Sequence, residues 1–125
     1  MKKFLRCDHC GNLVGVINDA GVPMICCGQP LTELVPNTTD AANEKHVPVV
    51  TVDGDILRAE VGSVEHPMEE AHYIQWIFVE TDKGGHKRTF KPGEKPVAEF
   101  NLHGEKPVAV YEYCNLHGLW KAEVK

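Results

Sequence analysis

Five possible metal ligands are spread over the sequence after residue 43, far from its other cysteines. They are His46, His66, His72, Cys114 and His117. Imidazole binds iron, copper, zinc and nickel, and a thiolate favours the softer of these metals. A structural zinc ion is normally complete with four ligands, whereas iron accepts five and keeps a further position for a small molecule. Four imidazoles and one thiolate therefore indicate a reactive metal rather than a structural one.

The neighbours of these ligands narrow the choice of metal without deciding it. Cys114 and His117 are separated by two residues on a loop expected to leave a strand, so both side chains can reach one ion. A blue-copper site needs a methionine after the histidine, and none follows His117; Met68 is the only methionine in this part of the chain. His103 competes with His117, because both stand in the sequence Asn-Leu-His-Gly. Copper, zinc and iron, and both histidines, remain possible at this point.

The first 35 residues contain the other four cysteines: Cys7, Cys10, Cys26 and Cys27. A segment of this size buries too little apolar surface to fold unaided, and four thiolates around one tetrahedral ion would supply the missing stability. Glycine follows Cys10 and Cys27, which allows tight turns that aim backbone N–H groups at the sulfurs. The spacing favours zinc and iron equally, and two disulfides fit less well because adjacent cysteines seldom bond to each other.

The five possible ligands after residue 43 are predicted to be held by β-strands. Residues 36–43 are interpreted as a polar linker that begins with a proline. Beyond it, short runs rich in valine, isoleucine and aromatic residues are separated by glycine-containing turn signals. Strands are expected at 47–52, 55–61, 72–81, 86–91, 97–102, 108–114 and 119–124. The pattern predicts an all-β chain with a four-cysteine metal domain at 1–36, then a seven-stranded immunoglobulin-like antiparallel β-sandwich at 37–125.

The expected strand at 72–81 begins at a ligand. Alternation along it would place Ile74, Trp76 and Phe78 on one face, with His72 at the head of the same row. His72 should therefore lie at the edge of the core. Trp76 and Trp120 are interpreted as core residues or walls of the site.

Composition and charge exclude several classes of protein. The 125 residues include 13 basic and 18 acidic side chains, a net charge of −5, without the basic and aromatic clusters that bind nucleic acid. No apolar run approaches the roughly 18 residues that span a bilayer, and the basic N-terminus lacks the apolar stretch of a secretory signal. A cytoplasmic protein is expected, in which a reducing environment keeps cysteines as thiols or metal ligands.

Several motifs together resemble those of one known family. Residues 44–48 (EKHVP), 66–72 (HPMEEAH) and 114–118 (CNLHG) are similar to the active-site motifs of desulfoferrodoxin, the two-iron class of superoxide reductase. Residues 7–11 (CDHCG) and 26–28 (CCG) resemble its desulforedoxin-like N-terminal domain. The likeness extends over nearly the whole chain, and it includes the four-cysteine cluster that the one-iron relatives lack.

This resemblance implies two iron ions per chain. One would be bound by the four cysteines Cys7, Cys10, Cys26 and Cys27, in a closed shell suited to electron transfer. The other would be bound by His46, His66, His72 and His117 in a plane, with Cys114 axial and the opposite face open. Superoxide would bind at the open face, accept one electron and leave as hydrogen peroxide after two protonations.

The resemblance also assigns roles beyond the ligands. Lys45 should attract the anionic substrate, and Glu44 looks like the carboxylate that can occupy the sixth position of ferric iron. A rubredoxin-like electron donor, a homodimer and a role in oxidative-stress defence are expected. His9, His86 and His103 are interpreted as surface or turn residues. Two other functions remain open: a pure electron-transfer iron protein, and a zinc-stabilised β-sandwich that binds a partner protein.

Overall fold

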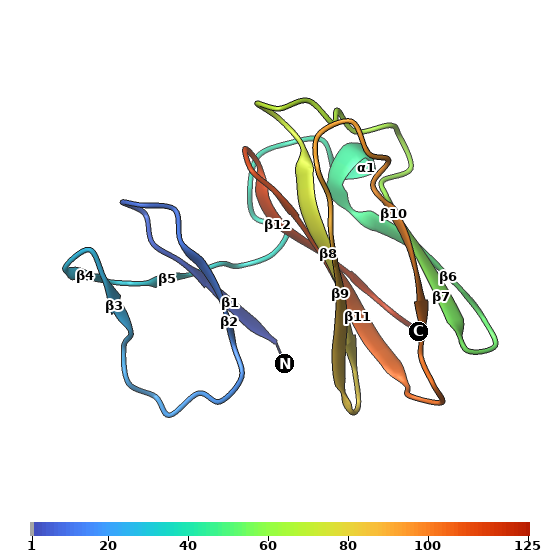
Figure 1. Cartoon of the computed structure of the whole chain (residues 1–125), viewed down its shortest axis with the longest axis horizontal. Coiled ribbons are helices and arrows are strands. Elements are labelled where there is room, and N and C mark those ends of the chain that lie inside the picture. The colour runs from blue at the N-terminus through green and yellow to red at the C-terminus, as the bar shows by residue number, and fades with distance from the viewer. Residues whose placement is uncertain (1) are drawn as a thin grey trace. The chain divides into compact units, whose positions relative to one another are not determined.

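The computed structural model describes residues 2–125, which divide into two compact units at the junction of Val35 and Pro36. Both units are built almost entirely from antiparallel strands (Figure 1). The predicted all-β fold class is therefore confirmed, while the assignment of functional domains to 1–36 and 37–125 stays a prediction. Within the described residues, no helix is both long enough and apolar enough to cross a membrane.

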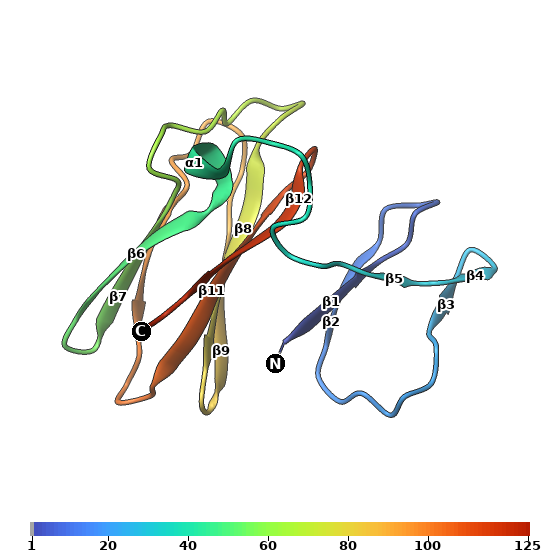
Figure 2. The same ribbon diagram turned by 180° about the vertical axis from the view of Figure 1, so that it is seen from behind.

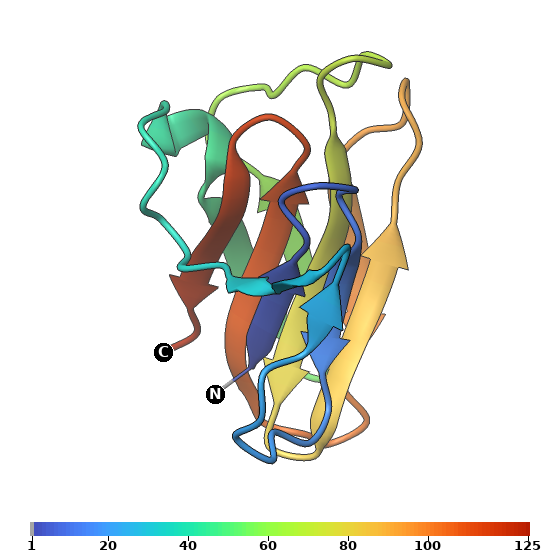
Figure 3. The ribbon, with the colours of Figure 1, turned by 90° about the vertical axis from the view of Figure 1, so that its left-hand side faces the viewer.

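The first unit is a set of short strands with very little core. Strand β1 (Lys3–Arg6) lies between β2 (Leu13–Val16) and β5 (Thr32–Glu33), and β3 (Ile25–Cys26) pairs with β4 (Gln29–Pro30). Figure 3 shows these strands in blue and cyan. Among residues 2–35 only Phe4 and Cys7 are buried, and Ile17 is 97% exposed. Apolar burial contributes little to the stability of this unit.

The second unit contains seven strands in two sheets. One sheet has the order β10-β7-β6, formed by Val97–Asn101, Ile56–Val61 and Pro48–Asp53. The other has the order β12-β11-β8-β9, formed by Gly118–Glu123, Pro107–Cys114, Ile74–Thr81 and Gly84–Thr89. Figures 1 and 2 show the two sheets as separate layers. This is the predicted immunoglobulin-like sandwich, with every predicted strand present.

The core of the second unit lies between its two sheets. Leu57 and Phe100 from the three-stranded sheet belong to the same buried cluster as Ile77 and Val110 from the four-stranded sheet. Fully burying side chains of this size stabilises the fold by about 1.5–3 kcal/mol each. The sandwich can therefore fold on apolar packing, unlike the first unit.

The predicted face of strand β8 is wrong beyond its first residue. Tyr113 pairs with Trp76 and Cys114 pairs with Ile74, so Gln75 is an extra residue that forms a β-bulge. The bulge shifts the alternation, so that Ile74 is in the core together with Ile77 and Val79. Trp76 instead stacks on Tyr113, with ring centroids 5.9 Å apart.

Three connections meet at one end of the sandwich. Helix α1 (Asn43–His46) precedes β6, residues 62–73 join β7 to β8, and residues 115–117 join β11 to β12; Figures 1 and 2 show all three at the same end. The segment before α1 is fixed along β12, because Asn37 donates its backbone N–H to Leu119 and exchanges two further hydrogen bonds with Lys121. Ligands far apart in the sequence are thereby brought to one place.

Candidate metal centres

His46 is positioned by the short helix α1. The helix is one turn long, closed by the N–H of Val47 donating to the carbonyl of Asn43 at 2.8 Å. The His46 ring is buried, and its Nδ1 donates to the carbonyl of Ala42 at 2.8 Å. Since Nδ1 carries the proton, Nε2 is left with its lone pair as a possible metal ligand.

The loop 62–73 supplies two more imidazoles. His66 is buried, and its Nδ1 donates to the carbonyl of Pro67 at 2.6 Å, which leaves Nε2 as the possible ligand. The Nε2 of His72 is buried and has no hydrogen-bond partner among the described residues. A buried polar nitrogen of this kind is costly unless it binds something, so His72 fits a metal ligand.

The turn from β11 to β12 supplies the fourth imidazole and the thiol. Cys114 is fully buried, and its Sγ is 3.9 Å from the Nδ1 of His117. Burial raises the pKa of the Cys114 thiol, and the backbone N–H groups of Leu116 and His117, which hydrogen-bond to the sulfur, oppose that rise. Amide groups aimed at the sulfur favour the thiolate that a metal requires.

These five side chains form one group. Their donor atoms, from His46, His66, His72, Cys114 and His117, all lie within 4.8 Å of one another. The Nε2 of His46 is 3.1 Å from the Nε2 of His66 and 3.1 Å from the Nδ1 of His117. His46, His66 and His72 each offer Nε2 as the possible metal ligand, whereas His117 offers Nδ1.

The four imidazoles form a closed square. Going round it, successive ring centroids are 4.7, 4.8, 5.0 and 4.8 Å apart, in the order His46, His66, His72, His117 and back to His46. Each ring is edge-on to its two neighbours, with interplanar angles of 77–87°. Nitrogen lone pairs that converge in a square, with a sulfur beside it, suit a metal that keeps a position for a further ligand.

The protonation states also fit a metal. Burial lowers the pKa of His66 to about 4, and burial likewise lowers the pKa of His46 and His72. These imidazoles are therefore neutral at pH 7, as metal binding requires. The donor set of neutral imidazoles and one thiol fits iron, the metal that the resemblance implies.

Trp120 forms one wall of this site. Its indole stacks on the His46 ring, with centroids 4.9 Å apart and planes 23° apart, and its Nε1 donates to the carbonyl of His117 at 3.0 Å. Trp120 is fully buried. Trp120 thus contacts ligands from two different elements. Of the two roles expected for it, core residue and wall of the site, this is the wall.

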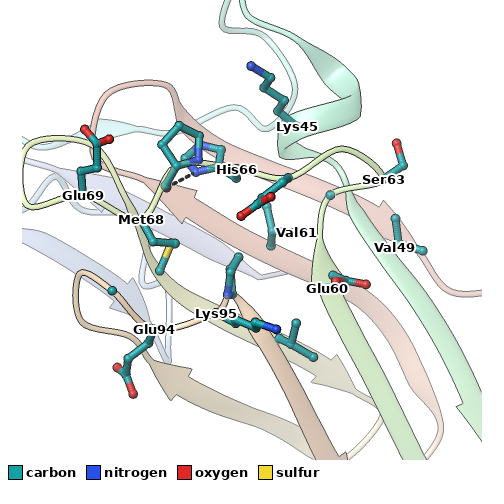
Figure 4. Close-up of a pocket in the computed structure, with 16 residues that line it drawn as sticks. Lys45, Val49, Glu60, Val61, Ser63, His66, Met68, Glu69, Glu94 and Lys95 are labelled. Atoms are coloured by element: carbon teal, nitrogen blue, oxygen red, sulfur yellow. Dashed lines mark hydrogen bonds between the residues drawn. The ribbon is translucent and has the colours of Figure 1, made fainter.

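The two charged residues of α1 lie outside the group of donor atoms. The side chains of Glu44 and Lys45 are exposed, and the carbonyl of Glu44 accepts the N–H of Val64 at 2.8 Å. Lys45 lines a groove of about 1010 Å³ that also includes His66 and Glu69 (Figure 4). After burial, the positive charge of Lys45 is among the causes that lower the pKa of His46 and His72. The charge of Lys45 therefore acts on these two histidines.

The four cysteines of the first unit form a separate group of possible metal ligands. The sulfur atoms of Cys7, Cys10, Cys26 and Cys27 lie within 4.8 Å of one another, and none of the cysteines is in a disulfide. Tight turns bring them together: Cys27 and the glycines after Cys10 and Cys27 have positive φ angles of 54°, 84° and 75°.

Four crowded sulfurs cannot all be thiolates without a cation. The backbone N–H of Cys10 lowers the pKa of Cys7 to about 6, whereas hydrogen bonds that the Cys27 thiol donates to neighbouring sulfurs, that of Cys10 foremost, raise the pKa of Cys27 to about 12. A metal ion would neutralise these charges, and four sulfurs make a closed shell. The group fits an ion that exchanges electrons without binding a substrate.

The other residues considered as possible metal ligands do not belong to either group of donor atoms. His103 is exposed in the turn between β10 and β11, with a φ angle of 51°, and His86 contacts Glu105 at 3.2 Å. Met68, the candidate copper ligand, accepts the N–H of Ile74 on its sulfur at 3.3 Å. Sequence reasoning missed Glu112, a fully buried carboxyl on β11 whose pKa burial raises well above its ordinary value. A glutamate inside an otherwise apolar strand is the signal that could have identified it.

Two family models match the chain. The one described as desulfoferrodoxin matches residues 38–123, and the one described as desulfoferrodoxin, N-terminal domain, matches residues 1–34. A desulfoferrodoxin from Nitratidesulfovibrio vulgaris is 48% identical over 121 residues, which are 97% of this chain and 95% of the relative. A superoxide reductase from Pyrococcus horikoshii is 32% identical over 107 residues, covering 69% of this chain and 90% of the relative.

Solved structures give the same result. The superoxide reductase from Treponema pallidum superimposes with a TM-score of 0.81 at 35% identity, covering 98% of this chain and 99% of that one. A superoxide reductase (1Fe-SOR) from Giardia intestinalis superimposes with a TM-score of 0.54 at 34% identity, covering 66% of this chain and 98% of that one.

Proposed function

The chain belongs to the desulfoferrodoxin family, and from that premise we propose that it is a superoxide reductase. It transfers one electron to superoxide, which takes up two protons and leaves as hydrogen peroxide. The observation that carries the proposal is the square of four imidazoles beside Cys114, with all donor atoms within 4.8 Å. A site of this composition has room for a substrate, which a closed four-ligand shell does not.

Two iron ions fit the two groups of ligands. Cys7, Cys10, Cys26 and Cys27 would hold the first, and His46, His66, His72, Cys114 and His117 would hold the second. When bound at the second centre, ferrous iron supplies the single electron that superoxide accepts. The backbone carbonyls of Ala42 and Pro67 orient two of the imidazoles, and the ligands come from three separate segments of the sandwich.

The charges of the site favour an anionic substrate. Neutral imidazoles and one thiolate around a divalent ion leave about one net positive charge. Lys45 adds an ammonium group to the groove that His66 also lines (Figure 4). The net charge of −5 opposes this attraction, but charges farther than the Debye length of about 8 Å are screened at physiological salt. The local positive field then decides how fast superoxide arrives.

Glu44 is proposed to be a displaceable ligand rather than an obligatory proton donor. Its exposed side chain is two residues from His46 on the same turn of helix. An exposed carboxylate so close to the centre can approach a ferric ion and leave again when a substrate anion takes its place.

The remaining parts of the proposal concern partners and location. The four-cysteine centre in domain 1–36 would exchange electrons, a rubredoxin-like protein would restore the electron used at the catalytic domain 37–125, and the chain would act as a homodimer. Family membership supports these assignments. Five cysteines without disulfides support a cytoplasmic location, where thiols stay reduced.

The test is rapid mixing of the reduced full-length protein with superoxide. We expect the second centre to be oxidised near the diffusion limit, with one hydrogen peroxide formed per superoxide and no oxygen released. The alternative, a pure electron-transfer protein, is favoured by the four-cysteine centre and predicts that superoxide leaves the second centre reduced. Metal analysis on the same samples tests the zinc alternative. Zinc at both centres, with no visible absorption, would contradict the redox proposal.

A further inference from the structure

The sequence Asn-Leu-His-Gly occurs twice, and the two copies use their asparagines differently. In the first copy, the Oδ1 of Asn101 accepts the backbone N–H of His103 at 2.9 Å and so closes its own turn. In the second copy, the N–H groups of Leu116 and His117 hydrogen-bond to the sulfur of Cys114 instead. The sulfur thus takes over the accepting role, and the carboxamide of Asn115 is available to another segment.

Asn115 makes three hydrogen bonds to the segment that carries His72. Its Oδ1 accepts the N–H of Tyr73 at 3.0 Å, its Nδ2 donates to the carbonyl of Ala71 at 3.0 Å, and its backbone N–H donates to the carbonyl of Tyr73 at 3.3 Å. One partner of the carboxamide is a backbone donor and the other a backbone acceptor, which fixes its orientation. The residues on both sides of His72 are therefore tied to Asn115.

In the described part of the chain, the other hydrogen bonds next to His72 stay within its own segment. The backbone groups of His72 are used within its own turn, where they exchange hydrogen bonds of 2.9 and 3.0 Å with Glu69. Its Nε2 has no partner among residues 2–125. The bulge at Gln75 places Tyr73 opposite Asn115, so the local distortion of β8 is what permits these contacts.

We propose that Asn115 is a positioning residue that joins His72 to Cys114 and His117, so that three ligands from two separate connections are in place when iron binds. Outer partners that orient metal ligands typically contribute tenfold to a hundredfold in metal affinity. The inference rests on the proposed function only in requiring that iron occupies the second centre; it does not depend on the reaction with superoxide.

The experiment compares iron release from the iron-loaded, full-length wild type, Asn115→Ala and the matched control Asn101→Ala. Each protein is challenged with an excess of EDTA, and the two centres are followed separately by their visible absorption. We expect Asn115→Ala to lose iron from the second centre about tenfold faster or more, with the first centre unchanged. Asn101→Ala, altered in the same sequence context, should match the wild type at both centres.

A second measurement does not involve iron. In the iron-free chain, the amide of Tyr73 should be protected from hydrogen exchange in the wild type and exposed in Asn115→Ala. Asn115→Asp keeps the oxygen that accepts the Tyr73 N–H, so this amide should stay protected, and this variant also serves if Asn115→Ala does not fold. Free energies of unfolding of iron-free Asn115→Ala and Asn101→Ala should be similar, which separates positioning from a general loss of stability.

Three outcomes would overturn the inference. They are iron release from Asn115→Ala at the wild-type rate, equally fast release from Asn101→Ala, or an unprotected Tyr73 amide in the wild type. A wild-type chain that holds no iron at the second centre would overturn the proposed function as well, whereas the first three outcomes leave the proposed function intact.

Discussion

Lys45 is the residue on which capture of superoxide should depend most. Lys45 lines the groove together with His66, and, after burial, its positive charge is among the causes that lower the pKa of His46 and His72. Lys45→Ala should slow the reaction with superoxide roughly two- to tenfold and weaken its dependence on ionic strength. Rapid mixing at several salt concentrations measures both effects, and the iron content should not change.

Lys95 provides the matched control for this prediction. It lines the same groove, as Figure 4 shows, and Lys95→Ala changes the net charge by the same amount. If attraction is local, Lys95→Ala should react nearly as fast as the wild type. Equal slowing by both substitutions would mean that the positive charge of the groove, and not Lys45 itself, governs capture.

Glu105 should make the stability of the sandwich depend on pH. Thr81 donates a hydrogen bond to its carboxylate at 2.7 Å and His86 contacts it at 3.2 Å; these contacts lower the pKa of Glu105 below its ordinary value of 4.5. A lowered carboxyl pKa stabilises the folded state above the unfolded-state pKa, and this contribution is lost as the pH falls through the folded-state pKa. Thr81 ends β8 and Glu105 precedes β11, so they lie at the ends of these strands opposite to His72 and Cys114.

The corresponding variant is Glu105→Gln. The free energy of unfolding of the wild type should exceed that of the variant at pH 7, and the difference should shrink when denaturant unfolding is repeated near pH 4 and below. Glu99→Gln, at an exposed position of β10, controls for the loss of one negative charge. A difference between wild type and Glu105→Gln that stays constant with pH would remove the carboxylate from this role.

Among the elements, the strands of the sandwich could be predicted and the short segments could not. All seven strands appear because each spans five or more residues and is separated from the next by turn signals. Helix α1 has four residues and the strands of the first unit have two to four, which is too short for any periodicity. The face of β8 was wrong because a one-residue bulge at Gln75 leaves no trace in the hydrophobic pattern.

Gly62 controls how closely the loop after β7 approaches α1. A Cβ at this position would lie 2.6 Å from the carbonyl oxygen of Glu44, 3.0 Å from the carbonyl carbon of Lys45 and 3.1 Å from the carbonyl oxygen of Val47. All three are backbone atoms, so the helix that carries His46 would have to move. Gly62→Ala should lower the free energy of unfolding by about 1–3 kcal/mol and alter the visible spectrum of the second centre.

Gly15→Ala is the control for this substitution. A Cβ on Gly15 would meet side-chain atoms at ordinary distances of 3.7 and 3.8 Å, and Gly15 belongs to a different unit from the second centre. Denaturant unfolding and absorption spectra of the two variants decide the matter. A Gly62→Ala protein with wild-type stability and spectrum would show that α1 is not held by this close approach.

At the scale of the molecule, the ligand types could be identified from the sequence but their convergence could not be derived from it. His46, His66 and Cys114 stand in separate segments, and only the sandwich topology brings those segments to one end. The choice of His117 over His103 rested on the family resemblance and on Cys114, which precedes only the second copy of the motif. The contacts that distinguish the copies, such as those of Asn115 to Ala71 and Tyr73, join residues more than 40 positions apart, and no local pattern records them.

The two units should respond differently to the loss of metal. The first buries only Phe4 and Cys7 among residues 2–35, and its crowded sulfurs need a cation, so its fold depends on the first centre. The sandwich has a continuous apolar core and should persist without metal. Cys26→Ser removes one ligand of the first centre, and His117→Ala, the control, removes one ligand of the second.

Hydrogen exchange on the full-length variants measures this difference. In Cys26→Ser the amide of Leu5, which lies in β1 between its two neighbours, should lose its protection, while the amide of Val79 in β8 keeps it. In His117→Ala both amides should remain protected, because the first unit keeps its metal centre and the sandwich keeps its apolar core. Protection of Leu5 that survives Cys26→Ser would mean that the first unit folds without its metal, in which case its four cysteines would serve electron transfer alone.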